Sequence, residues 1–362
     1  TFLVGGTPVE RGYHHLFRSD FAMVELVDKL GLTESLNWFN SNSGYFHAGK
    51  IWKFTTPLDL LKFQPLSFND RIRLGLMTLY LQKRKEWRSL ETQTASAWIR
   101  KNAGENIYKV IFEPMLRGKF GKYFDQVSMA WLWNKFALRT TSRGKGVKGM
   151  FTEQLGYPIG SFEIIFDSLK QEISSAGGKV FTDARVEKVI IEDNKAKGLF
   201  ARIGGKDIYE GDYDAVIATV PSYVFNNLIP ELPNDYRTQL GKATYLAAVL
   251  AVLVLDRQLT STYWMYVGDR TMPFLGVIEH TNMVSHEHYG GNHIIYLGNY
   301  LDQDDPTYGL SETELLDFYL PSLKRLNPDF NAAWIKEYHY HREQAAQPVV
   351  TRAYSDQIPS HR

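Results

Sequence analysis

The stretch Leu155–Pro221 decides the fold: LGYPIGSFEIIFDSLKQEISSAGGKVFTDARVEKVIIEDNKAKGLFARIGGKDIYEGDYDAVIATVP. Apolar residues recur at helical spacing near its start, at Phe162, Ile165, Phe166, Leu169 and Ile173. The Gly177-Gly178 pair that follows suits a left-handed C-terminal cap. The pattern therefore predicts a helix that ends at these glycines and packs by its apolar face.

Strands are expected after this helix, at residues 179–181, 186–191, 198–203, 206–209 and 215–220. The Asp193-Asn194 pair is typical of a tight turn between two of them. The last strand, Ala215–Val220, is mostly apolar and stops at Pro221, which suits a strand covered on both faces. The stretch thus predicts a helix, an antiparallel meander and a returning buried strand.

This order of elements resembles the FAD-dependent amine oxidases, protoporphyrinogen oxidases and phytoene desaturases. A second block agrees: Gly5-Gly6 followed by Pro8–Phe17 resembles the segment that brings backbone against the isoalloxazine ring in that family. A flat ring can rest on backbone only where no Cβ intrudes, so a glycine suits that place. The resemblance implies a mixed α/β fold, with an incomplete Rossmann-like FAD-binding domain and a substrate domain of sheet and helices.

The resemblance also implies FAD as the cofactor and assigns residues to it. Those expected at the cofactor are Glu10, Gly12, Tyr13, His14, Val186, Ala218, Thr219 and Pro221. The first four would lie near the flavin ring and the last four near the ADP half. No catalytic residue is fixed; His14 and His15 are candidates, each either lining the reactive face or serving as a hydrogen-bonded structural histidine. Glu10 is expected to support the cofactor segment, and Arg11 to face solvent.

The same resemblance divides the chain. Residues 1–19, 153–222 and 340–362 would form a discontinuous FAD-binding domain, 20–152 a helical part of the substrate domain, and 223–339 its sheet-containing part. Helices are expected from Asp20 and from Ser67, the second with Ile72, Leu76, Leu79 and Tyr80 as its apolar stripe. Later strands are expected at 245–255, 263–267, 275–279 and 293–300.

The composition excludes several classes of function. With 44% hydrophobic and 14% aromatic residues the chain can build sizeable cores, and a net charge of +1 gives no footprint for nucleic acid. No cysteine is present, so disulfides, thiolate nucleophiles and cysteine-bound metals are excluded. The run Ala243–Leu255 is shorter than the roughly 20 residues of a spanning helix. We expect a small, apolar substrate, no metal and a cytoplasmic location, and leave peripheral membrane contact and the oligomeric state open.

Aromatic residues cluster twice, at Trp131, Trp133 and Phe136 and at Trp264, Tyr266 and Phe274. Core packing is the default interpretation, and lining of an apolar substrate site is the alternative.

A literal GxGxxG occurs at Gly144, Gly146 and Gly149, but no apolar strand precedes it. We therefore interpret this segment as a flexible basic connection between domains. Compared with the family, the first strand, phosphate loop and helix and the last FAD-contacting segment are missing. We therefore expect a fragment that binds FAD weakly.

The resulting hypothesis is an FAD-dependent oxidoreductase, in which flavin N5 takes a hydride from a C–N or C–C bond of the substrate. Two alternatives remain. Relatives of this fold use flavin without net redox, as sugar mutases do. The chain could also be a non-catalytic fragment.

Overall fold

The computed structural model describes residues 1–141, 153–211 and 213–359, so the GxGxxG glycines lie outside the described residues. The chain forms two compact units: Thr1–Phe166 with Leu246–Arg352, and Asp167–Tyr245 with Ala353–Arg362. Their boundaries differ from those of the predicted domains, since the predicted FAD-binding domain is shared between the two units. That division remains a proposal about function, and each unit is described by itself.

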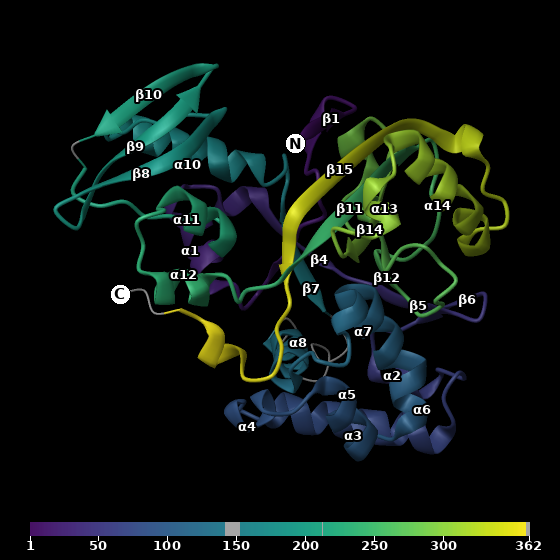
Figure 1. Ribbon diagram of the computed structural model, residues 1–362. Helices are drawn as coiled ribbons and strands as arrows, with labels where there is room; N and C mark the ends of the chain where they lie inside the picture. The colour runs from purple at the N-terminus through teal and green to yellow at the C-terminus, as the bar shows by residue number, and fades with distance from the viewer. Residues whose placement is uncertain (142–152, 212, 360–362) are drawn as a thin grey trace. The chain divides into compact units, whose positions relative to one another are not determined.

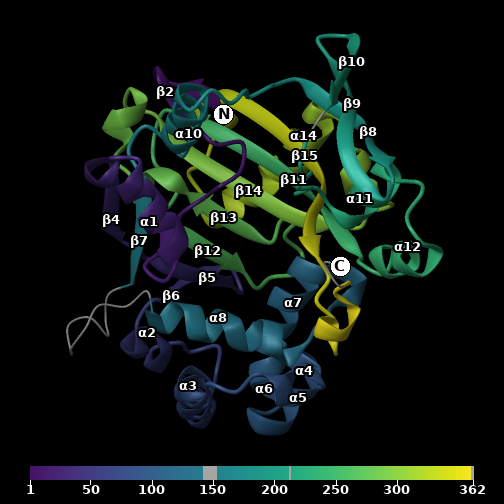
Figure 2. The same cartoon turned by 90° about the vertical axis from the view of Figure 1, so that its left-hand side faces the viewer.

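A seven-stranded mixed sheet organises the first unit (Figures 1 and 2). Its order is β15 (Ile335–Pro348), β11 (Tyr245–Leu255), β14 (His293–Leu301), β13 (Gly276–Glu279), β12 (Trp264–Val267), β5 (Ser43–His47) and β6 (Lys50–Lys53). The strands expected at 245–300 are confirmed. Three strands of this sheet were not predicted: β15, and β5 and β6, which lie in the region predicted to be helical. β5 pairs in parallel with β12, which lies more than two hundred residues further along the chain. The local sequence around β5 does not indicate that pairing.

The two faces of this sheet are covered differently. One face packs on α14 (Glu312–Leu326), where Leu315, Tyr319 and Leu323 are fully buried. The other face packs on the N-terminal segment and its neighbours, which are β1 (Phe2–Val4), β2 (Thr7–Val9), β3 (Leu16–Phe17), β4 (Leu36–Asn40) and β7 (Gln154–Pro158). β7 lies between β3 and β4 in a three-stranded sheet. The N-terminal segment is thus held against the large sheet.

Helices form a layer beside the sheet in the first unit (Figure 1). They are α2 (Pro57–Leu61), α3 (Phe68–Lys83), α4 (Arg88–Glu91), α5 (Ala95–Asn102), α6 (Glu105–Ile107), α7 (Glu113–Phe120) and α8 (Met129–Thr141). Two further helices of the unit, α1 (Phe21–Lys29) and α13 (Pro306–Gly309), lie outside this layer. A π-helical turn, Tyr108–Phe112, joins α6 to α7. The helices expected after Asp20 and Ser67 are confirmed, and the Ser67 hydroxyl accepts from the backbone N–H of Asp70.

The predicted apolar stripe of α3 is wrong. Ile72, Leu76, Leu79 and Tyr80 are 41%, 63%, 50% and 51% exposed, whereas the buried stripe is Leu74, Met77 and Leu81. The helix carries two apolar stripes on different sides. Spacing alone cannot tell which of them faces the protein, because both satisfy the helical repeat.

The second unit contains most of α10 (Glu163–Ser175), then β8 (Ala184–Glu192), β9 (Lys195–Ile203), β10 (Lys206–Gly211), α11 (Ser222–Leu228) and α12 (Asn234–Leu240). The helix and the meander are confirmed, but the predicted burial of the helix's apolar face is wrong at Phe166 and Ile173, which are 64% and 42% exposed. Asp193 and Asn194 have φ of 48° and 59°, as a tight turn between strands allows. The strands predicted at 179–181 and 215–220 are wrong. Neither segment pairs with another strand in the described part of the chain, and Ile217 is 89% exposed.

Candidate functional site

Glu10 fixes the N-terminal segment to three other elements. Its Oε2 accepts a hydrogen bond from the Tyr157 hydroxyl at 2.8 Å, and its Oε1 accepts one from the Phe162 backbone N–H at 2.7 Å. Its carbonyl oxygen accepts one from the Tyr296 hydroxyl at 2.8 Å. The residue is buried, so these donors replace the water that a carboxylate would otherwise bind. The chain that follows Glu10 therefore begins from a fixed position.

Burial keeps the tyrosines around Glu10 protonated. It raises the pKa of Tyr157 above its ordinary value, and the charge of Glu10 raises it further. The same two causes raise the pKa of Tyr296. The raised pKa values favour the protonated hydroxyls, which are the forms that donate to Glu10.

The segment Arg11–His15 bends at Arg11 and Gly12 and belongs to no sheet. Among the described residues, no partner accepts a hydrogen bond from the backbone N–H of Gly12 or Tyr13. An ideal Cβ at Gly12 would lie 3.4 Å from Leu250 Cδ1, an ordinary contact. The protein's own packing therefore does not require glycine at this position, and the backbone here is available to a ligand.

The two candidate histidines lie differently. His14 is exposed, and its Nδ1 lies 2.7 Å from the Gly12 carbonyl oxygen. His15 is half-buried, with Nδ1 2.9 Å from the Tyr263 hydroxyl and its ring edge-on to Phe17 and Trp264. His15 thus has the contacts of a packed, hydrogen-bonded histidine, while the ring of His14 turns back onto its own backbone.

Aromatic side chains surround this segment on one sheet face. The pairing register places Trp264, Tyr266 and Tyr300 on the same face as Leu250. The Tyr13 ring meets the Trp264 ring edge-on at 5.0 Å, and an ideal Cβ at Gly298 would lie 3.4 Å from Tyr13. These side chains are half-buried. We call Tyr13, Leu250, Trp264, Tyr266 and Tyr300 the aromatic face.

Only part of the two predicted aromatic clusters belongs there. Phe274 packs on the opposite face of the sheet, against Tyr319 at 5.2 Å, as core packing predicts. Trp131, Trp133 and Phe136 pack against the helical core. Trp264 and Tyr266 are therefore the two cluster members that the structure places beside Tyr13.

Lys119 is a neighbour of the aromatic face that sequence reasoning missed. Its Nζ lies 4.1 Å from the centre of the Tyr300 ring, in the last turn of α7. Burial, followed by the charge of Lys135, lowers the pKa of Lys119 to about 7. Lys119 forms no ion pair with any residue that the structure describes. The sequence around Lys119 does not indicate that it is buried, because the residues that bury it include Tyr300 of β14, which is distant in the sequence.

The residues expected near the ADP half of FAD lie in the second unit. Val186 on β8 is half-buried against a cluster of Val189, Leu228 and Ile229. Ala218 and Thr219 are exposed in the extended segment before α11, and Pro221 is the residue preceding that helix. Their approach to Glu10–His14 remains a prediction.

Comparison with known proteins identifies the family. The chain belongs to the flavin containing amine oxidoreductases, with a match over residues 1–355. It is 25% identical over 274 residues to coproporphyrinogen III oxidase of Staphylococcus aureus, which covers 68% of this chain and 57% of that protein. The chain thus spans little more than half the length of this relative.

Solved structures share the fold. A protein of Exiguobacterium sp. 255-15, provisionally assigned as a protoporphyrinogen oxidase, matches with a TM-score of 0.71 at 16% identity, over 97% of this chain and 78% of that one. Reduced UDP-galactopyranose mutase matches with a TM-score of 0.71 at 13% identity, over 98% and 76%. At these identities the similarity concerns the fold.

The residues present fit a flavin. An isoalloxazine ring needs flat apolar contacts and hydrogen-bond donors, and the aromatic face and the unpaired N–H groups of Gly12 and Tyr13 offer both. The family implies a flavin as cofactor.

Among the described residues, no helix is both long and apolar enough to span a membrane.

Proposed function

We propose that the protein is an FAD-dependent oxidoreductase that moves a hydride from a C–N or C–C bond of a small apolar substrate to the flavin. The observation that carries the proposal is that the backbone N–H groups of Gly12 and Tyr13, beside the aromatic face, have no acceptor among the described residues. Family membership supports it independently. When bound, the flavin supplies the hydride acceptor, and no protein nucleophile is required.

Each part of the site has a proposed task. Glu10 positions the segment, and Gly12 leaves room for the ring. Tyr13, Trp264 and Tyr266 exclude water from the substrate side, which strengthens the remaining electrostatic interactions. Lys119 places an amine beside this face that gains or loses its proton near pH 7, because its pKa is about 7.

For the other half of FAD we propose Val186, Ala218, Thr219 and Pro221. Support comes from the sequence resemblance and from the exposure of Ala218 and Thr219. We also propose that residues 1–19, 153–222 and 340–362 form the cofactor domain. The cell location proposed is the cytoplasm, with peripheral contact to a membrane.

A flavin-dependent mutase is the second candidate, favoured by the match to UDP-galactopyranose mutase. The two activities differ in stoichiometry. An oxidase or desaturase consumes one two-electron acceptor per turnover, whereas a mutase consumes none.

The test begins with flavin binding. FAD is titrated into the chain and into a version lengthened at both ends, and flavin fluorescence and the visible spectrum are recorded. We expect saturable binding that is tighter in the lengthened protein. Candidate amines, porphyrinogens and sugar nucleotides are then added without oxygen, and bleaching of the flavin absorbance is measured. Absence of flavin binding in both versions would reject the proposal, and turnover without acceptor consumption would favour the mutase.

A further inference from the structure

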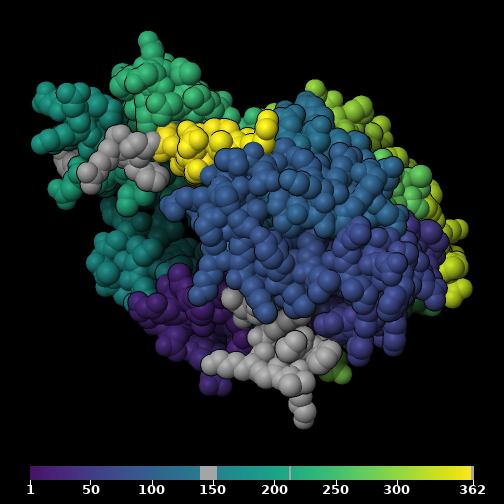
Figure 3. Space-filling view, turned by 90° about the horizontal axis from the view of Figure 1, so that it is seen from below, coloured from purple at the N-terminus to yellow at the C-terminus, as the bar shows by residue number. Residues whose placement is uncertain are grey.

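The outward side of α2 and α3 exposes large apolar side chains. Leu58 and Leu61 of α2 are 56% and 40% exposed, and Phe68, Ile72, Leu76 and Leu79 of α3 are 62%, 41%, 63% and 50% exposed. We call these six residues the α2–α3 apolar face. Figure 3, the view from below, shows the blue surface of the helical layer to which these helices belong. Apolar surface gathered in this way commonly marks an interaction site.

The two helices are fixed relative to each other. The Arg71 guanidinium donates to the carbonyl oxygens of Leu61 and Leu66, which ties the end of α2 to the start of α3. An ideal Cβ at Gly75 would lie 3.8 Å from Leu60, so α2 lies against the edge of the exposed stripe. Leu74 and Leu81 hold the opposite side of α3 in the core. The exposed stripe therefore cannot turn inward.

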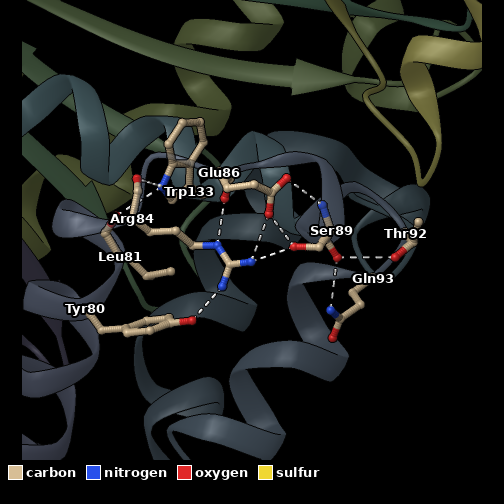
Figure 4. Close-up of polar contacts among 8 residues, drawn as sticks. All are labelled: Tyr80, Leu81, Arg84, Glu86, Ser89, Thr92, Gln93 and Trp133. Atoms are coloured by element: carbon tan, nitrogen blue, oxygen red, sulfur yellow. Dashed lines mark hydrogen bonds and ion pairs between the residues drawn. The ribbon is translucent and has the colours of Figure 1, made fainter.

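The far end of α3 is fixed as well. Figure 4 shows the Arg84 guanidinium within a polar cluster, where it donates to the Tyr80 hydroxyl at 2.5 Å, the Glu86 carbonyl at 2.7 Å and the Ser89 hydroxyl at 2.5 Å. The Trp133 indole N–H donates to the carbonyls of Leu81 and Arg84 at 3.0 and 3.1 Å. This cluster holds the chain after α3 against α4 and α8. These hydrogen bonds fix the position of the C-terminal end of α3, where the apolar face ends.

Charges around the apolar face are predominantly positive. Lys62, Lys83 and Lys85 are exposed, and none of them forms an ion pair within the part of the chain that the structure describes. The three nearby carboxylates keep their negative charge, and residues 57–86 together carry six lysines and arginines against these three. Asp59 accepts from the Thr56 N–H at 2.8 Å, Asp70 from Asn106 at 2.7 Å, and Glu86 from Ser89 at 2.6 Å.

We propose that the α2–α3 apolar face binds the surface of an anionic phospholipid bilayer. Its leucines, Ile72 and Phe68 would enter the boundary between headgroups and acyl chains, as the apolar side of an interfacial helix does. Lys62, Lys83 and Lys85 would lie among the lipid phosphates, where lysines are attracted to anionic membranes. A second copy fits less well, because symmetric pairing would bring the two lysine rims together. The proposal rests on none of the flavin-site residues.

The test uses the whole chain and vesicle sedimentation. Vesicles of phosphatidylglycerol with phosphatidylcholine are compared with vesicles of phosphatidylcholine alone. The apolar variant combines Phe68→Ser, Ile72→Ser and Leu76→Ser, and the charge variant combines Lys62→Glu, Lys83→Glu and Lys85→Glu. We expect each to weaken binding to the anionic vesicles by more than about tenfold. Phe318→Ser, at a 49% exposed position of α14, and Lys195→Glu, in the second unit, are matched controls that should bind as the parent does.

Two results would overturn the proposal. One is a parent protein that does not sediment with anionic vesicles, or variants that sediment as well as the parent. The other is a dimer in analytical ultracentrifugation that the apolar variant abolishes, which would assign the face to self-association. Circular dichroism confirms that each variant is folded. Because sedimentation is measured without reference to bound flavin, its failure leaves the redox proposal intact, and loss of flavin binding leaves the lipid proposal intact.

Discussion

Glu10 and Tyr157 are 147 residues apart in the sequence, yet the Tyr157 hydroxyl donates to Glu10 Oε2 across 2.8 Å. The bond joins the end of the N-terminal hairpin to β7, the central strand of the sheet β3-β7-β4. Glu10 also accepts from the start of α10 through the Phe162 N–H. One buried carboxylate therefore sets where the segment Arg11–His15 begins.

Removing this carboxylate should cost more than removing the hydroxyl. Glu10→Ala leaves the Tyr157 hydroxyl and the Phe162 N–H buried without their acceptor, and we expect about 3 kcal/mol of lost stability. Tyr157→Phe removes one donor from a charged acceptor and should cost about 2 kcal/mol. Urea unfolding measures both. Equal effects, or none, would show that Glu10 does not organise this segment.

Gly5 and Gly6 should respond differently to alanine. Both have positive φ, 56° and 85°, but only at Gly5 would an ideal Cβ lie 2.4 Å from the Tyr289 backbone. Gly5→Ala must displace the hairpin from Tyr289 and should cost more than about 2 kcal/mol, whereas Gly6→Ala should cost about 1 kcal/mol from backbone strain. Thermal unfolding of the two variants gives the comparison. A Gly6 variant as unstable as the Gly5 variant would contradict the close approach.

Gly12→Val should separate folding from flavin binding. An ideal Cβ at Gly12 meets only the ends of side chains, Leu250 Cδ1 at 3.4 Å and His14 Cε1 at 4.0 Å, which can shift, so we expect the melting temperature to stay within a few degrees of the parent. The branched side chain would occupy the place proposed for the flavin ring, so bound flavin should fall several-fold. The ratio of visible to ultraviolet absorbance after desalting measures it. Unchanged flavin content in a folded variant would remove Gly12 from the site.

His280 should make the first unit sensitive to acid. Its Nε2 lies 2.6 Å from the Tyr289 hydroxyl, and burial lowers its pKa from 6.5 to about 3. Between pH 6.5 and about 3, His280 therefore binds a proton in the unfolded chain but not in the folded chain. Its titration does not reduce the free energy of unfolding above pH 6.5, and reduces it progressively as the pH falls below 6.5.

Urea unfolding at several pH values tests this expectation. His280→Phe should lower stability at pH 7, because the Tyr289 hydroxyl loses one of its two hydrogen-bond partners, and should flatten the decline between pH 6.5 and 4. A variant with the same slope as the parent would show that other groups cause the acid sensitivity.

Lys119 should lose its proton near neutral pH. Because its pKa is lowered to about 7, the amine is a cation below that pH and a nucleophile above it. Acetylation of Lys119, followed by peptide mass spectrometry across a pH series, should therefore rise with a midpoint near pH 7. Lys135→Gln should move the midpoint upward, since the charge of Lys135 contributes to the lowering. A midpoint near that of a free lysine, roughly 10.4, would contradict the assignment.

Sequence alone determined the features that local hydrogen bonds fix. The Ser67 hydroxyl caps α3 by accepting from the backbone N–H of Asp70, a partner only three residues further along the chain. Gly177, with φ of 82°, ends α10, and Gly178 donates to Ile173. The resemblance to the family rests on the order of such locally determined helices, turns and strands along the chain. The candidate segment Glu10–His15 was predicted from the same resemblance.

Only the tertiary structure decided which residues meet across the chain. Burial beside β14, followed by the charge of Lys135, lowers the pKa of Lys119, and β5 becomes a strand because β12 pairs with it. Ala215–Val220 has the composition of a strand, but no partner strand pairs with it in the residues described. The outward side of α3 was mistaken for its core side for the same reason. Helix caps and turns are satisfied within a few residues, whereas strand pairing, burial and pKa depend on partners that sequence does not place.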